Sequence, residues 1–295
     1  MTPNRRELFP PSPLGGEGLG VRGRASDADD GFPSPPALLP SGEREVRTGR
    51  PTTPGTGPES PALAGFRVPA YELKFLLTEA QAGEVEAMLR DHLALDPHAD
   101  PTLGSAYRVT SVYFDTPRFD VYHRAAGHRT HKFRLRRYGS DPAVYLERKS
   151  KRAGRVWKRR TAVPLAGLDG LSGTADDWPG AWFARQLTAR GLRPVCRVTY
   201  ERTAFVGAGP DGPVRLTMDR FARGLASPTA GRVEPFDGGL PLLDRGVIVE
   251  FKFLAAMPAL FKEVVAALRL APSGVSKYRR CAAAAGLTAG GAGDA

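Results

Sequence analysis

The stretch HRTHKFRLRRYG at residues 128–139 decides the fold of this sequence, because its cations recur at every second position. Lys132, Arg134 and Arg136 fall on one face of an extended chain, and apolar residues alternate with them. A period of two is typical of a β-strand, whose successive side chains point to opposite faces. The polar face of a half-buried strand normally mixes neutral and charged residues, whereas this one is cationic. The stretch therefore predicts a strand with one apolar face and one strongly basic face.

The next stretch, VYLERKSKRAGRVWKRR, ends at Arg160 and repeats the pattern on both sides of a glycine turn. Glu147 and Lys149 share one face before the turn, and Lys158 shares a face with Arg160 after it. Residues 129–160 together hold thirteen lysines and arginines but only two acids. Neighbouring strands with this bias would repel one another unless anions lay between them.

Single acids also stand two residues before a lysine in three of the expected strands. The pairs are Glu72 with Lys74, Glu147 with Lys149, and Glu250 with Lys252. An inward-facing set of bases with a few carboxylates suits a multiply charged anion and a divalent metal. The alternative is a solvent-exposed sheet face, where runs of charge are usually found. Recurrence of the cations at period two over at least four strands favours the binding site.

The rest of the chain predicts further short strands and a few helices. Strands are expected at 66–77, 107–114, 130–138, 143–149, 156–163, 194–205, 214–218 and 247–254. Thr78 and Gln81 form a capping-box pattern that opens a helix, which ends before Pro97. Two more helices are expected at 181–189 and 259–270. The connections are too short for parallel crossovers, so the strands should pair antiparallel.

Composition points to a basic domain with a tail at each end. The 295 residues carry a net charge of +11, and residues 1–65 hold seven arginines and eight acids, so the remainder carries +12. Such an excess indicates an anionic partner. Residues 1–65 are rich in Pro and Gly without an apolar period, and we expect them to be disordered. This leaves one domain at 66–285 and a flexible C-terminal tail at 286–295.

Cysteine usage and hydropathy exclude several classes of protein. Cys196 and Cys281 are the two cysteines, and neither lies in a metal-ligand or CxxC spacing, so disulfides and zinc are not expected. No stretch approaches the run of about 18 apolar residues that crosses a bilayer. The N-terminus also lacks the apolar region of a signal peptide. We therefore expect a cytoplasmic protein.

Eight motifs in order resemble the VTC domain, the polyphosphate polymerase branch of the triphosphate tunnel metalloenzymes, also called CYTH-like proteins. They are YELKF at 71–75, SVYFDT at 111–116, RLRRYG at 134–139, LERKSKRAGRVWKRR at 146–160, VTYERTAF at 198–205, RLTMDR at 215–220, VIVEFKF at 247–253 and SKY at 276–278. The resemblance implies an α+β fold in which an eight-stranded antiparallel β-barrel forms a basic tunnel, with flanking helices.

The resemblance also implies roles for individual residues. Those that would act in catalysis are Arg134, Arg136, Lys149, Tyr200, Arg202 and Lys277. The two arginines of RLRRYG would clamp the nucleotide phosphates, and the tyrosine and arginine of VTYERTAF would hold the transferred phosphoryl group. The lysine of SKY would close the site from a C-terminal helix.

Further residues would bind phosphate or metal. The expected phosphate ligands are Lys74, Lys158, Ser276 and Lys252, and the expected metal ligands for Mn²⁺ or Mg²⁺ are Glu250 and Glu72. Lys252 shares a face with Glu250, so it is either a phosphate ligand or the ion-pair partner of that glutamate. The arginines on the opposite parity, Arg137, Arg148, Arg152 and Arg159, are expected to be surface charge. Asp115 and Asp219 end predicted strands, where capping and turn roles are common.

The function that follows from the resemblance is transfer of the γ-phosphate of ATP to a growing polyphosphate chain, with a membrane-protein partner possible for the product. One alternative is a triphosphatase of the same fold, but those relatives carry ExExK in the first strand, and this chain has Ala70 at the first acidic position. A second is a non-catalytic polyphosphate binder, because 272–275 lack a lysine that polymerase relatives tend to carry there. A nucleic-acid binder is not expected, since inward-facing arginines cannot reach a duplex.

Overall fold

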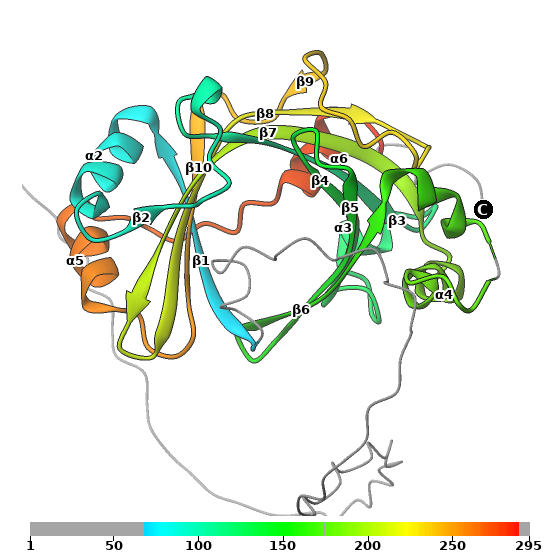
Figure 1. Ribbon diagram of the computed structural model, residues 1–295, viewed down its shortest axis with the longest axis horizontal. Coiled ribbons are helices and arrows are strands. Elements are labelled where there is room, and N and C mark those ends of the chain that lie inside the picture. Colours follow the sequence, from blue (N-terminus) through cyan, green and yellow to red (C-terminus); the bar gives the residue numbers. More distant parts are fainter. Residues whose placement is uncertain (1–67, 174, 289–295) are drawn as a thin grey trace, which may run out of the picture. The chain divides into compact units, whose positions relative to one another are not determined.

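A single antiparallel sheet returns on itself in the computed structural model (Figure 1), which describes residues 68–173 and 175–288. The predicted tail at 1–65 lies outside the described residues, as does most of the predicted C-terminal tail. The strands are β1 Ala70–Thr78, β2 Ala94–Leu95, β3 Tyr107–Asp115, β4 His131–Tyr138, β5 Ala143–Arg152, β6 Arg155–Pro164, β7 Arg193–Gly209, β8 Gly212–Ala226, β9 Leu240–Pro241 and β10 Gly246–Phe253.

The strand order makes a ring. The sheet runs β2-β7-β3-β4-β5-β6-β1-β10-β8-β9, and β7 pairs in addition with β8. Every strand except the two-residue β2 and β9 therefore has a neighbour on each side, which gives a ring of eight antiparallel strands. The expected antiparallel α+β fold with eight main strands is confirmed.

The ring is held together unevenly. β1 and β10 pair along their length, from Tyr71 opposite Phe253 to Thr78 opposite Gly246. By contrast, β1 and β6 pair only at Ala70 opposite Val156 and at Tyr71 opposite Arg155. We call this short junction between β1 and β6 the seam. Beyond the seam, the described residues of β1 and β6 have no further backbone pairing with each other.

Three helices lie between strands in the described sequence, and two follow the last strand, β10. They are α2 Glu79–Leu89, α3 Asp120–His123, α4 Ala181–Ala189, α5 Ala259–Ala267 and α6 Lys277–Ala284, with 3₁₀ turns at Pro101–Leu103 and Leu165–Leu171. The predicted capping box of α2 is confirmed, since Gln81 N donates to Thr78 Oγ1 at 3.2 Å and Thr78 N donates to Gln81 Oε1 at 3.1 Å. No helix among the described residues is long and apolar enough to cross a membrane.

Two helices cover one outer side of the ring. α2 and α5 lie together beside β1 and β10 (Figure 1), and their apolar side chains share a cluster with those strands. Phe251 of β10 stacks on Phe261 of α5 with ring centroids 4.4 Å apart, and Phe75 of β1 lies 5.2 Å from Phe251. Full burial of a side chain of this size stabilises the fold by about 1.5–3 kcal/mol. The apolar faces of these strands therefore look outward to helices, which leaves their charged faces inward.

The apolar face of β4 is covered in the same way. Phe133 packs against Phe183 of α4 with centroids 5.7 Å apart, and Leu135 is fully buried in the same cluster. Both residues belong to the apolar parity that the first stretch of sequence predicted. Lys132, Arg134 and Arg136 consequently face the inside of the ring.

α6 lies against inward-facing residues at one end of the ring. The ring of Tyr278 packs on Tyr113 of β3 with centroids 5.5 Å apart, and its hydroxyl donates to Asp115. Asp115 also accepts from the backbone N–H of Val121 at 2.8 Å and of Tyr122 at 2.9 Å. The capping role expected for Asp115 is thus confirmed, and this buried carboxylate ties α6 to the end of β3.

β8 differs most from the sequence prediction. It was expected at 214–218 but continues through Asp219 to Ala226, because β7 pairs with it over this whole length. The register shifts between Thr199 and Glu201, and on the bulged side Phe221 has a φ of 50°. The prediction that Asp219 ends a strand is therefore wrong. Its side chain lies within the ring.

Candidate functional site

The inside of the ring encloses a cavity of about 1070 Å³. All of the residues that the sequence proposed as ligands or catalytic groups line it: Glu72, Lys74, Arg134, Arg136, Lys149, Lys158, Tyr200, Arg202, Glu250, Lys252, Ser276 and Lys277. They come from six strands of the ring and from α6. Segments as far apart in sequence as β1 and α6 thus contribute to one concave basic surface.

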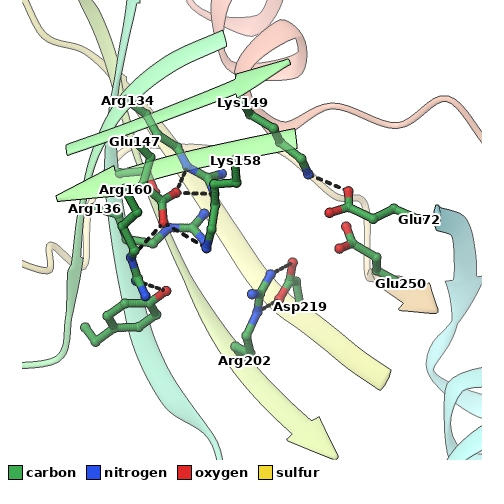
Figure 2. Close-up of polar contacts among 12 residues, drawn as sticks. Glu72, Arg134, Arg136, Glu147, Lys149, Lys158, Arg160, Arg202, Asp219 and Glu250 are labelled. Carbon is green, nitrogen blue, oxygen red and sulfur yellow. Dashed lines mark hydrogen bonds and ion pairs between the residues drawn. The ribbon is translucent and has the colours of Figure 1, made fainter. Parts of the chain in front are cut away.

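Glu147 of β5 is the centre of a cluster of three cations. The sequence placed it among the inward-facing carboxylates but gave it no individual role. Arg134 binds one carboxylate oxygen through Nη2 at 2.6 Å and Nε at 2.7 Å. Arg160 and Lys158 approach the other oxygen at 3.1 Å and 3.5 Å (Figure 2). Arg134 and Arg160 are the register partners of Glu147 on the two neighbouring strands. The carboxylate therefore holds three cations in fixed positions across three strands.

The electrostatics of Glu147 follow from its burial. The side chain is 1% exposed, and burial alone would raise its pKa. Arg134 and Lys158 outweigh this effect and hold the pKa well below its ordinary value. Glu147 is consequently a permanent anion that orders the basic wall.

Asp219 plays the same part on the opposite wall. Arg202 donates to it through Nε at 2.6 Å and Nη2 at 2.9 Å, and Lys277 of α6 donates to the same carboxylate. Burial would raise the pKa of Asp219, but Arg202 and Lys277 lower it below its ordinary value. Sequence reasoning missed this residue, although its alternation with Arg215 and Thr217 on β8 could have indicated an inward position.

Glu72 and Glu250 bring two carboxylates together on β1 and β10. Figure 2 shows their side chains pointing into the same space, and Lys149 of β5 reaches across to Glu72. Lys74 lies 3.3 Å from Glu250, which is its register partner. Burial would raise the pKa of Glu250, but Lys74 and Lys149 keep it well below its ordinary value. Glu250 is thus available as a charged oxygen ligand, with the carboxylate of Glu72 beside it.

These two glutamates fit a divalent cation that is shared with phosphate. Among the residues that the structure describes, no group of three or more His, Cys, Asp or Glu could hold a metal ion by itself. Mg²⁺, however, is usually bound through one or two carboxylates together with substrate phosphates and water. Glu72 and Glu250 supply that number of carboxylates, so the ligands present suit an ion that arrives with a polyphosphate.

Tyr200 of β7 is a buried contact of the cationic groups. Its hydroxyl accepts a hydrogen bond from Arg136 Nη2 at 2.9 Å, and Arg136 Nε donates to Ser111 at 3.2 Å. The ammonium of Lys277 lies 4.3 Å from the centre of the Tyr200 ring. Burial raises the pKa of Tyr200, so its hydroxyl stays protonated. The side chain orients Arg136 and Lys277 within the cavity wall.

The cavity contains more positive charge than its own carboxylates neutralise. Burial lowers the pKa of Lys277 to about 8 even though Asp219 opposes the change. Burial likewise lowers the pKa of Lys252 to about 8 against the effect of Glu72. An anion that binds beside these lysines would favour their protonated form and would therefore be stabilised in the cavity. The geometry therefore suits a ligand with several negative charges.

Of the four arginines on the opposite parity, Arg137 and Arg152 do not line the cavity, whereas Arg148 and Arg159 also contribute to its lining. Arg137 donates to the backbone oxygens of Asp141 at 2.7 Å and Ser140 at 3.1 Å. Arg159 lies over the ring of Trp182 at 4.1 Å. Arg137 is thus held by backbone oxygens away from the cavity, which makes it a suitable control for the inner arginines.

The sequence matches the model of the VTC domain over residues 69–285, and the chain belongs to this family. The match begins at the start of β1 and ends just after α6. It therefore covers all strands of the ring and the helices from α2 to α6. No curated protein matches the sequence.

Solved structures with similar folds share little sequence with this chain. A Bacillus halodurans protein named as a candidate adenylate cyclase has 13% identity and a TM-score of 0.44, covering 70% of this chain and 93% of that one. A Hippeastrum protein described as having a dominant triphosphatase activity has 12% identity and a TM-score of 0.39, covering 72% and 93%. The Pyrococcus horikoshii protein PH1012 has 13% identity and a TM-score of 0.37, covering 70% and 94%.

Proposed function

We propose that this chain is a polyphosphate polymerase, which transfers the γ-phosphate of ATP to the end of a growing polyphosphate chain inside the ring. The observation that carries the proposal is the cavity, whose lining combines lysines and arginines of many strands with a few ion-paired carboxylates. Membership of the VTC domain family supports the same function. On this proposal the ring is a closed barrel and its cavity is a triphosphate tunnel.

Transfer of the γ-phosphoryl group to a polyphosphate end needs no proton acceptor from the protein. The bond between the γ-phosphorus of ATP and its bridging oxygen breaks, and ADP leaves with that oxygen. An oxygen of the terminal phosphate of the chain forms the new bond to the same phosphorus. This terminal phosphate is already ionised near neutral pH. Because phosphoryl transfer has a loose transition state, positioning and charge neutralisation supply most of the catalysis.

The inner cations would divide this work. Arg134 and Arg136 occupy successive inward positions of β4 and would hold nucleotide phosphates. Arg202 and Lys277, which Asp219 fixes, would contact the phosphoryl group in transfer. Guanidinium groups bind phosphate oxygens in pairs, so arginines suit the positions where orientation matters most. Lys74, Lys149, Lys158, Lys252 and Ser276 would bind the remaining phosphates of the substrates.

Glu72 and Glu250 would hold Mn²⁺ or Mg²⁺ on the triphosphate. Such an ion shields the charge of phosphate oxygens and orients them. The two carboxylates lie on adjacent strands, and Lys74 and Lys149 hold the pKa of Glu250 well below its ordinary value.

The state of the carboxylates favours transfer to phosphate over hydrolysis. A triphosphatase has to activate water, which needs a base or a metal-bound hydroxide. The inner carboxylates Glu147, Asp219 and Glu250 all have pKa values below their ordinary range because of neighbouring cations. A carboxylate of lowered pKa is a weak base. These three carboxylates are therefore poor general bases for the activation of water.

The experiment that tests the proposal is an assay with ATP and Mn²⁺ that follows long-chain polyphosphate, ADP and free phosphate together. A polymerase yields polyphosphate in amounts that match ADP, and Arg134→Ala and Glu250→Ala abolish both products. Release of free phosphate without polymer would assign the chain as a triphosphatase. Tight binding of polyphosphate without consumption of ATP would assign it as a binding module.

Location and partners belong to the same proposal. A cytoplasmic polymerase has direct access to ATP, and a membrane-protein partner would receive the product. Fractionation of cells that express the tagged chain tests both, because a soluble chain without any membrane-bound share contradicts the partner.

A further inference from the structure

Lys132 lines the cavity, although sequence reasoning assigned it no role there. It stands on β4, two residues before Arg134 and on the same inward face. Its Nζ donates to the hydroxyl of Ser276 at 3.2 Å, and its register partner on β5 is Lys149. Ser276 is the N-cap residue of α6. The contact therefore joins the basic wall of the ring to the helix at its end.

The surroundings of Lys132 are cationic from every side. The pKa of Lys132 is lowered by the positive charges of four neighbours: Lys74 of β1, Lys149 of β5, Arg124 after α3 and Arg134 of its own strand. Among the described residues, no carboxylate lies within ion-pair distance of Lys132 Nζ, whereas Lys74, Lys149, Lys158 and Lys277 each pair with one. Within the described part of the chain, the hydrogen-bond partner of its ammonium is the neutral hydroxyl of Ser276. A half-buried ammonium without a carboxylate partner is suited to an anion from outside the chain.

Ser276 is arranged to bind the same anion. Its Oγ accepts from Lys132 Nζ and, at 3.5 Å, from the backbone N–H of Arg279. A hydroxyl has two acceptor lone pairs and one donor hydrogen. With both lone pairs in use, the O–H of Ser276 is left to donate. An ammonium and a hydroxyl donor thus lie side by side, a combination that matches the oxygens of one phosphate group.

We infer that Lys132 and Ser276 form a phosphate subsite at the α6 end of the cavity, and that Lys132 takes up a proton when a triphosphate or polyphosphate occupies it. The inference rests on the proposed function, because it concerns the same anion. It adds a residue that the family resemblance did not supply, and it gives that residue a measurable signature.

The proton uptake follows from the electrostatics. Burial, followed by the charges of Lys74 and Lys149, lowers the pKa of Lys132 to about 7. In the empty cavity the amine is therefore about half protonated at neutral pH. A neighbouring phosphate favours the charged form and raises this pKa, so anion binding and protonation are linked. The affinity contributed by Lys132 is complete below pH 7 and declines as the pH rises above it.

The test is isothermal titration calorimetry of the full chain with inorganic tripolyphosphate, without metal, at pH 8. Repeating the titration in buffers of different ionisation enthalpy gives the number of protons taken up. Lys132→Met should weaken binding about tenfold or more, since hydrogen bonds to charged groups contribute about 1.5–3 kcal/mol. It should also remove roughly half to one proton from the uptake. Lys262→Met, on the exposed face of α5, is the matched control and should change neither quantity.

Lys132→Arg separates charge from titration. Arginine stays protonated, so this variant should keep most of the affinity while losing the proton uptake and the decline of affinity between pH 7 and 9. Unchanged proton uptake and affinity in Lys132→Met would overturn the inference while leaving the polymerase assay untouched. Conversely, normal proton-linked binding in a chain that makes no polyphosphate would overturn the proposed function but not the subsite. Failure of the wild-type chain to bind tripolyphosphate would overturn both.

Discussion

Arg202 and Asp219 are register partners on β7 and β8, and they form a bidentate ion pair with N–O distances of 2.6 and 2.9 Å. Asp219 is 2% exposed and binds Lys277 of α6 as well. One buried carboxylate therefore fixes an arginine of the ring and a lysine of the closing helix. Because both cations line the cavity, the geometry of the site depends on the carboxylate that pairs with them.

Asp219→Asn should damage both stability and activity. Removal of the charge leaves Arg202 and Lys277 buried without their counterion, and breaking a buried pair from one side costs about 3–5 kcal/mol. Urea denaturation should show this loss, and the steady-state KM for ATP should rise. Asp244→Asn, which changes an exposed aspartate, should stay within about 0.5 kcal/mol of wild type. Equal effects of the two variants would contradict the role given to Asp219.

Arg134→Ala should lower kcat/KM by about a hundredfold or more, as removal of a positioned donor to a transition-state oxygen does elsewhere. Arg137→Ala is the matched control on the same strand, since Arg137 binds backbone oxygens on the outer side. The control should keep nearly full activity. Thermal melting of both variants separates catalysis from folding, because Glu147 retains Arg160 and Lys158 when Arg134 is removed. A control as inactive as Arg134→Ala would argue against the inward face as the site.

Glu250→Gln and Glu72→Gln should each raise the metal concentration that gives half-maximal activity, by roughly tenfold for each lost ligand charge. The reason is that a neutral amide binds Mg²⁺ or Mn²⁺ more weakly than a carboxylate. Titration of the protein–triphosphate complex with Mn²⁺, followed by electron paramagnetic resonance, measures binding independently of turnover. Glu201→Gln alters a glutamate on the outer side of β7 that lies 3.9 Å from Arg108, and it should leave metal binding unchanged.

Acid should unfold the ring through its inner carboxylates. The folded-state pKa values of Glu147, Asp219 and Glu250 lie below the ordinary values of 4.5 for Glu and 3.8 for Asp. These groups therefore contribute stability that is fully present above about pH 5 and is lost as the pH falls through the folded pKa values. Urea midpoints between pH 6 and 3 measure the slope. It should flatten in Glu147→Gln and remain in Glu263→Gln, which changes an exposed position of α5.

Deletion of residues 1–65 should leave folding and activity intact. The family match covers residues 69–285 and so lies wholly outside this segment. Comparison of melting temperature and polymer yield between the two chains is the measurement. A clear drop in either quantity would assign the N-terminal segment a part in the domain.

The strands could be predicted wherever side-chain alternation and pairing agree. In β4 the basic and apolar parities are unbroken, and the predicted strand lies within one residue of the observed one. In β8 the alternation of apolar and polar residues breaks after Asp219, because a second charged residue, Arg220, follows directly. Pairing with β7 nevertheless carries the strand to Ala226. Strand formation depends on cross-strand neighbours as much as on intrinsic preference, so the second half of β8 could not be read from its own residues.

The alternation of side chains predicted which residues face the cavity, but it could not predict the ion pairs and hydrogen bonds between them. Alternation indicated which cations face inward, and the family motifs indicated which of them bind phosphate. The organising role of Glu147 depends on the register that sets Arg134 and Arg160 beside it, and register is a property of three strands at once. Lys132 and Ser276 are 144 positions apart, so no local pattern relates them. The order of the strands in the ring brings residues that are this far apart in sequence into contact.

The seam between β1 and β6 should make the structure of the ring sensitive to ionic strength. Backbone pairing there ends after Tyr71, and the next inward residue, Glu72, is joined instead to Lys149 of β5, on the far side of β6. A backbone hydrogen bond is insensitive to dissolved salt, whereas an ion pair with a partly exposed ammonium is screened by it, with a Debye length of about 8 Å at physiological ionic strength. The other junctions of the wall are fastened by long runs of peptide groups, but this one has two backbone-paired positions and the ion pair between Glu72 and Lys149. Potassium chloride would therefore loosen the ring at one place along its circumference, next to the carboxylates proposed to hold the metal.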